Sequence, residues 1–406
     1  MICPHSHREP NKYMSNEKEI STKVPNLRFP EFSDVWRGVE LGDFLINKQR
    51  KVQKPNTLYK AVGIRSHFKG TFQKMDSDPK NISMTELFKV QENDFIVNIT
   101  FAWEGALAIA RQTDDGGLVS HRFPTYEFEE KVSSHRFFRY VFPTMRMKYN
   151  LGNISPGGAG RNRVLNKKDL LKLKILLPEI QEQQKIAEFL TKADNWLANL
   201  KNQKQELENY KKGVMKIVFS NKSNTNNWTT HLIGEIISVS NKKYNPKTDK
   251  GNYPDIEMES LEKNTGKLIK TFDSKSLKSI KNFFNEGDVL FGKLRPYLRK
   301  YYLSKMSGVC STEIWVLSSN LLQNNFLYYL VQSGNFNRYT QQSSGSKMPR
   351  AEWSYIAQQS IDIPDRSKQQ KIAAFLTSID KLIESKQNQV SEAEKWNKGL
   401  LQQMFV

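Results

Sequence analysis

The sequence predicts an α+β protein in which two mixed α/β domains alternate with two long helices that pair as an antiparallel coiled coil. A duplicated helical segment, heptad spacing of apolar residues within it and strand-like runs before each copy lead to this prediction. From the N-terminus, the expected parts are a disordered tail at 1–22, a first domain at 23–177, a central helix at 178–222, a second domain at 223–363 and a C-terminal helix at 364–406.

Composition limits what this chain can be. Of its 406 residues, 38% are hydrophobic and 26% are charged, which is typical of a folded protein, although residues 1–22 are polar and lack an apolar period. The chain has 62 Lys and Arg residues against 42 Asp and Glu, so its net charge is +20. Such a charge favours binding to a polyanion or to an acidic lipid surface. No secretory signal and no run of about 18 apolar residues is present, and there are only two cysteines. We therefore expect a cytoplasmic protein without a membrane partner.

The two domains are assigned from strand-like runs with Gly and Pro between them. DFIVNITF and GALAIA are predicted strands of the first domain, DVLFGK and STEIWVLS are predicted strands of the second, and NFLYYLVQSG is a predicted short helix. The domains share only a skeleton of positions, such as Trp36 with Trp228 and Gly42 with Gly234. Two domains that diverge on a common frame indicate a tandem recognition protein that reads two different targets.

The two helices are assigned from an internal duplication. Residues 178–219 align with 364–405 without a gap, with seventeen identities in forty-two positions, including EQQKIAEFLTKAD against KQQKIAAFLTSID. Two seven-residue series per copy predict a coiled-coil seam. The seam positions that we expect to pair are Ile186, Phe189, Trp196, Leu200, Gln203 and Leu207 in the first copy, and Ile372, Phe375, Leu382, Gln389 and Trp396 in the second.

Each apolar stripe could instead pack only on its own domain. A helix of about 39 residues is roughly 58 Å long, which is longer than one small domain covers, so we favour pairing between the copies. Gln203 and Gln389 would then place a polar side chain at the same inner position of each helix, which can fix register or orientation.

No catalytic motif stands out in the sequence. GxxxxGK[ST], HExxH, paired-cysteine and GxSxG patterns are absent, and Cys3, His5 and His7 lack a fourth ligand, so we expect neither catalytic residues nor a metal. Asp255, Asp273 and Lys275 form a loose nuclease-like pattern that could surround a metal. A metal-dependent nuclease therefore stays open as an alternative.

Basic loops in both halves predict nucleic-acid binding. The richest segment, FGKLRPYLRKYY at 291–302, combines cations with aromatic rings, although a strand pair with a solvated basic face is the competing interpretation. Glycine-bearing basic loops precede both helices, and GIRSHFKG adds a basic hairpin to the first domain. The DNA-binding candidates are Arg65, Lys69, Arg161, Arg163, Lys293, Arg295, Tyr297, Arg299, Lys300, Lys347 and Arg350.

These motifs resemble those of the DNA specificity subunit of Type I restriction-modification systems. The resemblance covers nearly the whole chain beyond the tail, and it rests on VPNLRFPEFSDVWRGVELGDF at 24–44, GDVLFGKLRPYLRK at 287–300 and the two P…QQKIA.FLT…D helix starts. Glu182 and Gln183 keep the Glu-Gln pair of the family pattern, whereas Lys368 replaces the acid in the second copy. The first domain has VNITFAWEG at 97–105 in place of the basic run.

The resemblance implies two target recognition domains that each read one half of a bipartite site in double-stranded DNA, while the paired helices set the spacer. It implies a non-catalytic subunit that recruits two modification (methyltransferase) subunits and further restriction subunits. S-adenosylmethionine, ATP and Mg²⁺ would be bound by those partners, and no cofactor by this chain. A coiled-coil adaptor that binds no DNA is the second alternative.

Overall fold

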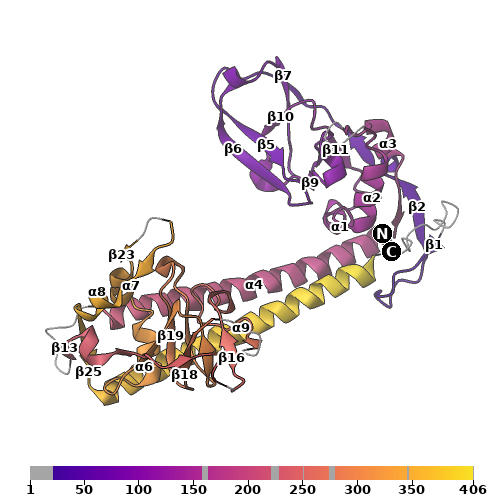
Figure 1. Cartoon of the computed structure of the whole chain (residues 1–406). Coiled ribbons are helices and arrows are strands. Elements are labelled where there is room, and N and C mark those ends of the chain that lie inside the picture. Colours follow the sequence, from indigo (N-terminus) through magenta and orange to yellow (C-terminus); the bar gives the residue numbers. More distant parts are fainter. Residues whose placement is uncertain are drawn as a thin grey trace, which may run out of the picture. The chain divides into compact units, whose positions relative to one another are not determined.

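The computed structural model describes residues 22–157, 163–220, 228–249, 251–273, 279–344 and 347–405. The chain forms two compact units. The first consists of the chain up to Ala198 together with the segment from Ser391, and the second is Asn199–Val390. Each unit thus contains one mixed α/β domain and part of each long helix (Figure 1). Within the described residues, no helix has both the length and the hydropathy needed to cross a membrane.

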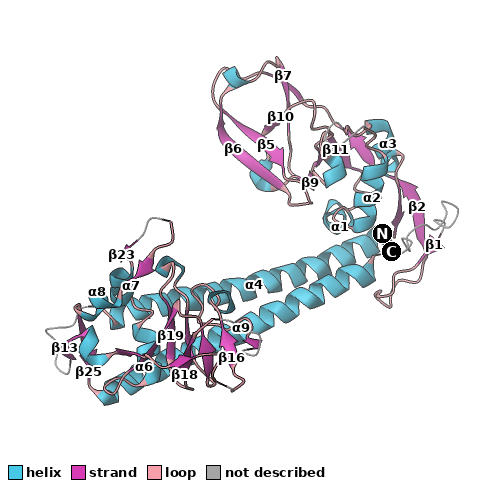
Figure 2. Ribbon diagram, in the orientation of Figure 1, coloured by secondary structure: helices cyan, strands magenta, loops and turns pink. Residues whose placement is uncertain are grey.

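The domain of the first unit is built on three sheets. A three-stranded sheet has the order β1 (Thr22–Lys23), β2 (Trp36–Glu40) and β12 (Lys174–Leu177). A five-stranded sheet has the order β4 (Lys51–Gln53), β7 (Glu86–Lys89), β10 (Leu118–Val119), β5 (Tyr59–Ile64) and β6 (Thr71–Ser77). A four-stranded sheet has the order β3 (Leu45–Asn47), β11 (Thr125–Phe128), β8 (Phe95–Val97) and β9 (Leu107–Ile109). Helices α1 (His135–Val141), α2 (Met145–Asn153) and α3 (Lys167–Leu171) lie between β11 and β12 in the chain (Figure 2).

The domain of the second unit repeats this topology. A five-stranded sheet has the order β15 (Lys243–Tyr244), β18 (Lys281–Phe284), β21 (Gly308–Cys310), β16 (Pro254–Ile256) and β17 (Phe272–Asp273). A four-stranded sheet has the order β14 (Ser238–Val239), β22 (Ile314–Ser318), β19 (Val289–Gly292) and β20 (Tyr301–Leu303). Two-stranded sheets pair β13 (Trp228–Leu232) with β25 (Ser360–Pro364) and β23 (Ser343–Ser344) with β24 (Arg350–Ala351). Its short helices are α5 (Ile233–Ile236), α6 (Asn324–Leu330), α7 (Gly334–Thr340) and α8 (Trp353–Ala357).

The four predicted strands and the predicted short helix are confirmed: the strands are β8, β9, β19 and β22, and the helix is α6. All residues of β8 and β19 are buried, as expected for apolar runs in the middle of a sheet. Equivalent helices also begin in the same way: Thr144 caps the start of α2, and Ser333 caps the start of α7. The duplication seen in the helix starts therefore extends through the domains at the level of topology.

The long helices α4 (Ile180–Val218) and α9 (Arg366–Met404) contain 39 residues each and run antiparallel. Within the first unit, Asp194 accepts a 2.7 Å hydrogen bond from Asn397. Within the second, Lys211 forms a 2.6 Å ion pair with Asp380. Residue numbers rise along α4 as they fall along α9, so the predicted antiparallel pairing is confirmed.

The buried seam differs from the predicted one in its second series. Ile186 and Leu200 are buried as expected, and Leu207 and Ile372 are half-buried. The other predicted positions lie at the margin of the seam: Phe189 is half-buried, Trp196, Phe375, Leu382 and Trp396 are about half exposed, and Gln203 and Gln389 are exposed. The rings of Phe189 and Trp196 nevertheless contact the ring of Trp396 across the two helices.

The inner positions of the second series lie one residue later than predicted. Leu190 and Leu376 are fully buried, and each belongs to the core of its own domain. An offset of three and an offset of four residues both repeat every heptad, so the period alone could not choose between them. Packing against the domain selects the later positions, and this places Gln203 and Gln389 outside the seam.

Candidate nucleic-acid interface

Repeated glutamines hold each domain on its long helix. Gln183 donates to the carbonyl oxygens of Pro178 and Val132, both at 2.9 Å, and accepts the backbone N–H of Ser134 at 2.9 Å. Gln369 repeats all three contacts, with Pro364 at 3.0 Å, Leu321 at 3.4 Å and Gln323 at 3.1 Å. The duplicated sequence therefore fixes how each domain joins its helix.

In the second unit, the basic segment forms a tight loop between β19 and β20 that contains the short 3₁₀ helix η8 (Pro296–Leu298). Arg295 and Arg299, at its two ends, have positive φ angles of 51° and 49°. Such angles are unfavourable for residues other than glycine and are often found at functional sites. The loop is held in place because the backbone N–H of Asn264 donates to Arg299 O at 3.0 Å, and Arg299 Nη2 donates to Gln332 O at 2.6 Å.

Three of the predicted DNA-binding residues in this unit are tied to the protein itself. Arg299 bonds Gln332 as described, and Lys300 Nζ donates to Met258 O at 2.6 Å, while burial lowers the pKa of this ammonium group. Arg350 forms a bidentate pair with Glu313, at 3.0 to 3.1 Å, which raises the pKa of its guanidinium. These side chains support the loop, and they leave fewer donors for a ligand.

The other four predicted residues in this unit are available to a ligand. Arg295, Tyr297 and Lys347 are exposed and Lys293 is half-exposed, and among the described residues none of the four has a side-chain ion pair. Backbone hydrogen bonds join their two loops, from Arg295 N–H to Pro349 O at 2.7 Å and from Ala351 N–H to Lys293 O at 2.9 Å. Guanidinium, ammonium and phenol groups thus gather on one surface, which suits contacts with phosphates and base edges.

In the first unit, the predicted residues belong to two loops. Arg65 is exposed, donates to Thr71 O at 2.9 Å and stacks on the Phe72 ring at 5.0 Å, and Lys69 is exposed on the same hairpin. Arg163 donates to Ser155 O and Gly152 O at 3.0 and 2.9 Å, and stacks on Trp103 at 5.4 Å, so it braces its own loop.

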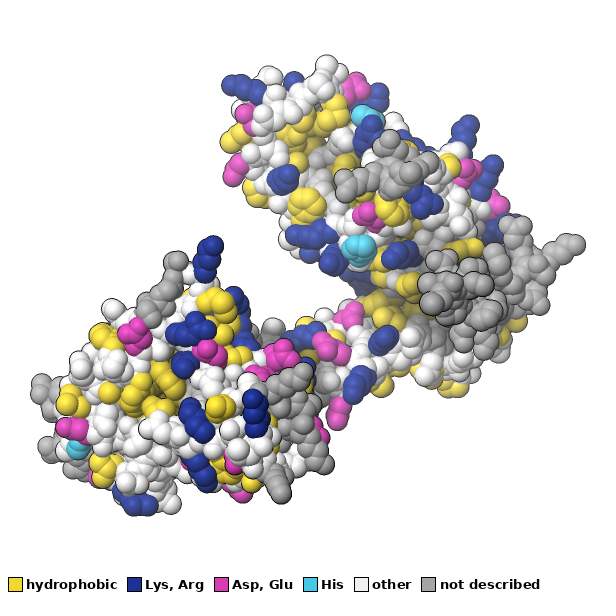
Figure 3. All heavy atoms as spheres, viewed as in Figure 1, with side chains coloured by type: hydrophobic (Ala, Val, Ile, Leu, Met, Phe, Trp, Pro, Cys, Tyr) yellow, Lys and Arg dark blue, Asp and Glu magenta, His cyan; other side chains and the backbone are white. Residues whose placement is uncertain are grey.

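Arg161 lies outside the described residues. On the face shown in Figure 3, Lys and Arg side chains are spread over both units with Asp and Glu between them.

The segment VNITFAWEG, which stands in place of the basic run and was given no binding role from the sequence, forms a loop equivalent to that of η8. It contains the 3₁₀ helix η4 (Ala102–Glu104) between β8 and β9. Four backbone hydrogen bonds of one loop have counterparts in the other. In each bond a backbone N–H donates to a carbonyl oxygen at 2.8 to 3.0 Å. Written from donor to acceptor, the bonds of the first unit are Asn98–Ala106, Ile99–Arg122, Leu165–Ile99 and Phe68–Gly105. Their counterparts in the second unit, in the same order, are Gly292–Lys300, Lys293–Glu313, Ala351–Lys293 and Asn264–Arg299.

The side chains of the two loops differ although these backbone hydrogen bonds are shared, so residue type gave no reason to assign a binding role to the first loop. The distance from the strand end was the usable signal. Arg122, which the sequence analysis also missed, is exposed beside this loop and donates to Thr100 Oγ1 at 3.4 Å.

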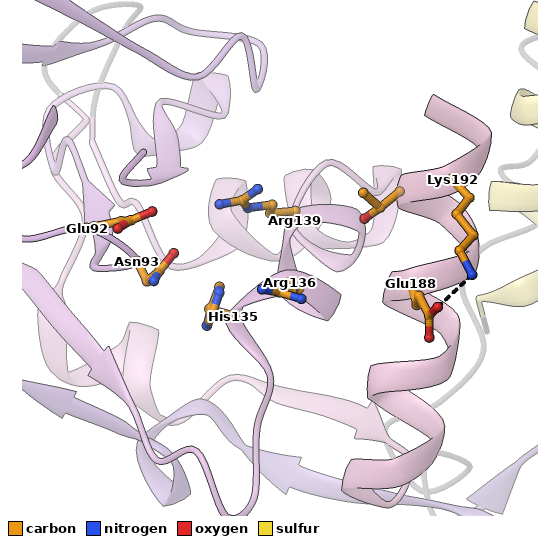
Figure 4. Close-up of a pocket in the computed structure, with 8 residues that line it drawn as sticks. Glu92, Asn93, His135, Arg136, Arg139, Glu188 and Lys192 are labelled. Atoms are coloured by element: carbon orange, nitrogen blue, oxygen red, sulfur yellow. Dashed lines mark hydrogen bonds and ion pairs between the residues drawn. The ribbon is translucent and has the colours of Figure 1, made fainter. Parts of the chain in front are cut away.

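A basic cleft of about 520 Å³ lies where the first domain meets α4 (Figure 4). Its cations are Arg136 and Arg139 on α1 and Lys192 on α4, and Lys192 is paired with Glu188 at 2.6 Å. Burial and the nearby charge of Arg139 lower the pKa of His135, which therefore stays neutral to a lower pH. The sequence analysis did not single out these residues.

Two residues of the nuclease-like pattern, Asp255 and Asp273, lie on the paired strands β16 and β17, where Asp273 is exposed. Asp255 is fully buried on β16, where Lys281 Nζ lies 3.1 Å from Oδ2, and Glu257 contacts the same ammonium group. Burial raises the pKa of Asp255, and the ion pair opposes that shift. Lys275 lies outside the described residues, and within them no group of three or more His, Cys, Asp or Glu side chains could hold a metal ion. Asp255 is therefore part of a buried ion pair and is not open to a substrate.

Comparison with known proteins identifies relatives of the chain. The family model described as the Type I restriction modification DNA specificity domain matches twice, at residues 34–209 and 225–395. The Type I restriction enzyme MjaVIII specificity subunit of Methanocaldococcus jannaschii is 24% identical over 423 residues, which cover 95% of each chain. The EcoDI specificity subunit of Escherichia coli is 21% identical over 334 residues, which cover 73% of each.

Solved structures show the same fold. The S subunit of a Type-I restriction-modification system from M. genitalium has a TM-score of 0.55 at 14% identity, covering 95% of this chain and 99% of that chain. A chain from a study of complex assembly and conformational transition of the type I R-M system has a TM-score of 0.54 at 15% identity, covering 91% of this chain and 97% of that chain.

Proposed function

This chain belongs to the Type I restriction modification DNA specificity family, and from that premise we propose that each of its two units reads one half of a bipartite site in double-stranded DNA. The paired helices α4 and α9 act as the ruler that sets the spacer between the half-sites. The chain is the non-catalytic, DNA-reading subunit of its complex.

The observation that carries this proposal is the pair of equivalent loops. In both units the 3₁₀ loop is held by the same backbone hydrogen bonds, yet Arg295 stands at the N-terminal end of one short helix and Phe101 at that of the other. Glu313 likewise corresponds to Arg122. Shared backbone hydrogen bonds with different side chains are what two readers of different sequences require, because base edges are distinguished by the groups that face them.

The charge of the chain supplies the affinity that does not depend on sequence. With a net charge of +20, binding to a duplex releases condensed counterions, so affinity falls as salt rises. Lys347 and Lys69 are exposed beside the reading loops and suit phosphate contacts, which orient a protein on DNA without reading its sequence.

The partners follow from the same proposal. Two modification subunits bind the helices and the N-terminal segment at 24–44, and they supply S-adenosylmethionine for adenine methylation. Restriction subunits add ATP- and Mg²⁺-dependent translocation and cleavage. The complex works in the cytoplasm, where it meets the genome and incoming DNA.

A competition experiment tests the proposed function. The full chain is incubated with random-sequence duplexes, the bound DNA is amplified over several rounds, and the enriched sequence is challenged with excess random duplex. We expect a split consensus whose binding survives the competitor. Binding that disappears under competition would favour an adaptor without sequence preference, and cleavage of DNA by the chain with Mg²⁺ alone would favour a nuclease.

A further inference from the structure

The loop of η4 occupies, in the first unit, the place that the arginine-bearing loop of η8 occupies in the second. Besides the four hydrogen bonds already described, the turn of each short helix closes in the same way, from Glu104 N–H to Phe101 O at 3.0 Å and from Leu298 N–H to Arg295 O at 2.9 Å. Both loops end on a left-handed residue, Gly105 in one and Arg299 in the other. Phe101 therefore holds the loop position that Arg295 holds in the other unit, although φ is −124° at Phe101 and 51° at Arg295.

We propose that Phe101 is a specificity-determining residue of the first unit and contacts the 5-methyl group of a thymine in the half-site that this unit reads. The inference rests on the proposed function, and it assigns a base contact to a loop that lacks the basic run of the second unit. The Phe101 side chain is 43% exposed, so its ring is accessible to a ligand.

The chemistry of the side chain selects the thymine methyl group. A phenyl ring cannot bond phosphate, and it offers no donor or acceptor to the polar base edges. In the major groove only thymine presents an apolar group, its C5-methyl, and phenylalanine is one of the side chains that contact it. Because Arg295 bears a guanidinium fork that suits guanine, the two units read unlike bases from equivalent loops.

Neighbouring cations complete the reading surface. Arg122 is exposed beside this loop, where its guanidinium donates to Thr100 Oγ1 at 3.4 Å. The hairpin that carries Lys69 is held against the loop by the 2.9 Å hydrogen bond from Phe68 N–H to Gly105 O. Cations next to an apolar contact can hold the DNA backbone while the ring reads one base pair.

The test uses duplexes that carry the consensus selected by the full chain. Each thymine is replaced in turn by deoxyuridine, which removes only the methyl group, and the dissociation constant is measured for the unmodified chain and for Phe101→Ala. We expect one position in one half-site where the replacement weakens binding of the unmodified chain about fourfold, the factor that corresponds to one buried methyl group. Phe101→Ala should weaken binding to thymine DNA at least as much, and should not respond to deoxyuridine at that position.

Leu58→Ala is the matched control, because Leu58 is an exposed apolar residue of the same unit that lies outside the reading loops. It should keep the deoxyuridine response of the unmodified chain. The inference is overturned if no thymine shows the response, if Phe101→Ala keeps it, or if Phe101→Ala loses affinity equally on thymine and deoxyuridine DNA, as a ring inserted between base steps would. If no consensus is selected at all, the proposed function fails before this test begins.

Discussion

The hydroxyl of Tyr329 donates a 2.8 Å hydrogen bond to Asp380 Oδ2, and so ties helix α6 of the second domain to the long helix α9. The other carboxylate oxygen of Asp380 is 2.6 Å from Lys211 on α4. In the first unit the same relationship links Tyr140 to Asp194 at 2.9 Å, and Asp194 in turn accepts from Asn397. Each aspartate therefore joins its own domain and both long helices.

The first prediction concerns the stability of this junction. Tyr329→Phe removes the donor to Asp380 and should lower the free energy of unfolding by about 1 to 2 kcal/mol, since the lost hydrogen bond is made to a charged acceptor. Urea unfolding monitored by circular dichroism measures the change. Tyr297→Phe is the control, because Tyr297 is exposed on the reading loop and should leave the unfolding midpoint unchanged. Equal midpoints for Tyr329→Phe and the unmodified chain would contradict the role given to this junction.

The second prediction is a pH dependence. Burial, together with the Asp194 carboxylate, raises the pKa of Tyr140 to about 12. Since the folded-state pKa lies above the unfolded value of ~10, the protonated hydroxyl stabilises the fold below pH ~10, and this contribution is lost as the pH rises towards 12. The unfolding free energy of Tyr140→Phe should therefore fall less over that interval than that of the unmodified chain. Parallel curves for the two proteins would show that Tyr140 does not titrate as described.

The third prediction separates base contacts from phosphate contacts. Arg295→Ala should relax sequence preference in one half-site only, at a cost of ~1 to 3 kcal/mol for the preferred base, because a bidentate guanidinium contact is lost. Quantitative binding to a library of single-base variants of the site measures this loss. Lys347→Ala is the comparison variant, since it should weaken binding to every variant alike and reduce the salt dependence by about one ion. A uniform loss on all DNA for Arg295→Ala would assign that residue to phosphate.

The fourth prediction concerns the ruler. Seven residues inserted after Leu200 in α4, together with seven after Val390 in α9, preserve the heptad pattern and extend the paired region by roughly 10 Å. The selected DNA site should keep both half-sites and gain spacer length. Altered half-sites with an unchanged spacer would contradict the proposal that the helices set the spacing.

The duplicated helix starts predicted much of the architecture, because the residues that join a domain to its helix recur at a fixed spacing. Gln183 and Gln369 make the same contacts, so the sequence identity at these two positions reflects a shared structure. The second heptad series could not be placed from its period, because only packing of Leu190 and Leu376 against the domains distinguishes two offsets that both repeat every seven residues.

The binding role proposed for the loop of the first unit was not recognised from the sequence, although VNITFAWEG stands in place of the basic run of the second unit. Its backbone hydrogen bonds match those of the second unit, whereas its side chains do not, and sequence comparison registers only side chains. Arg163, Arg299 and Arg350 matched the composition of a binding loop, and the structure adds that each forms hydrogen bonds with the protein itself. A cation near a glycine-rich turn could not be assigned to either role before its partners were known.

A genome-wide map of methylated adenines, in cells with and without this chain, tests the central proposal most directly. We predict that one bipartite motif, with two fixed half-sites and a spacer of constant length, is methylated only when the chain is present. Identical maps in the two strains, or dependence of a single unsplit motif on the chain, would contradict the account.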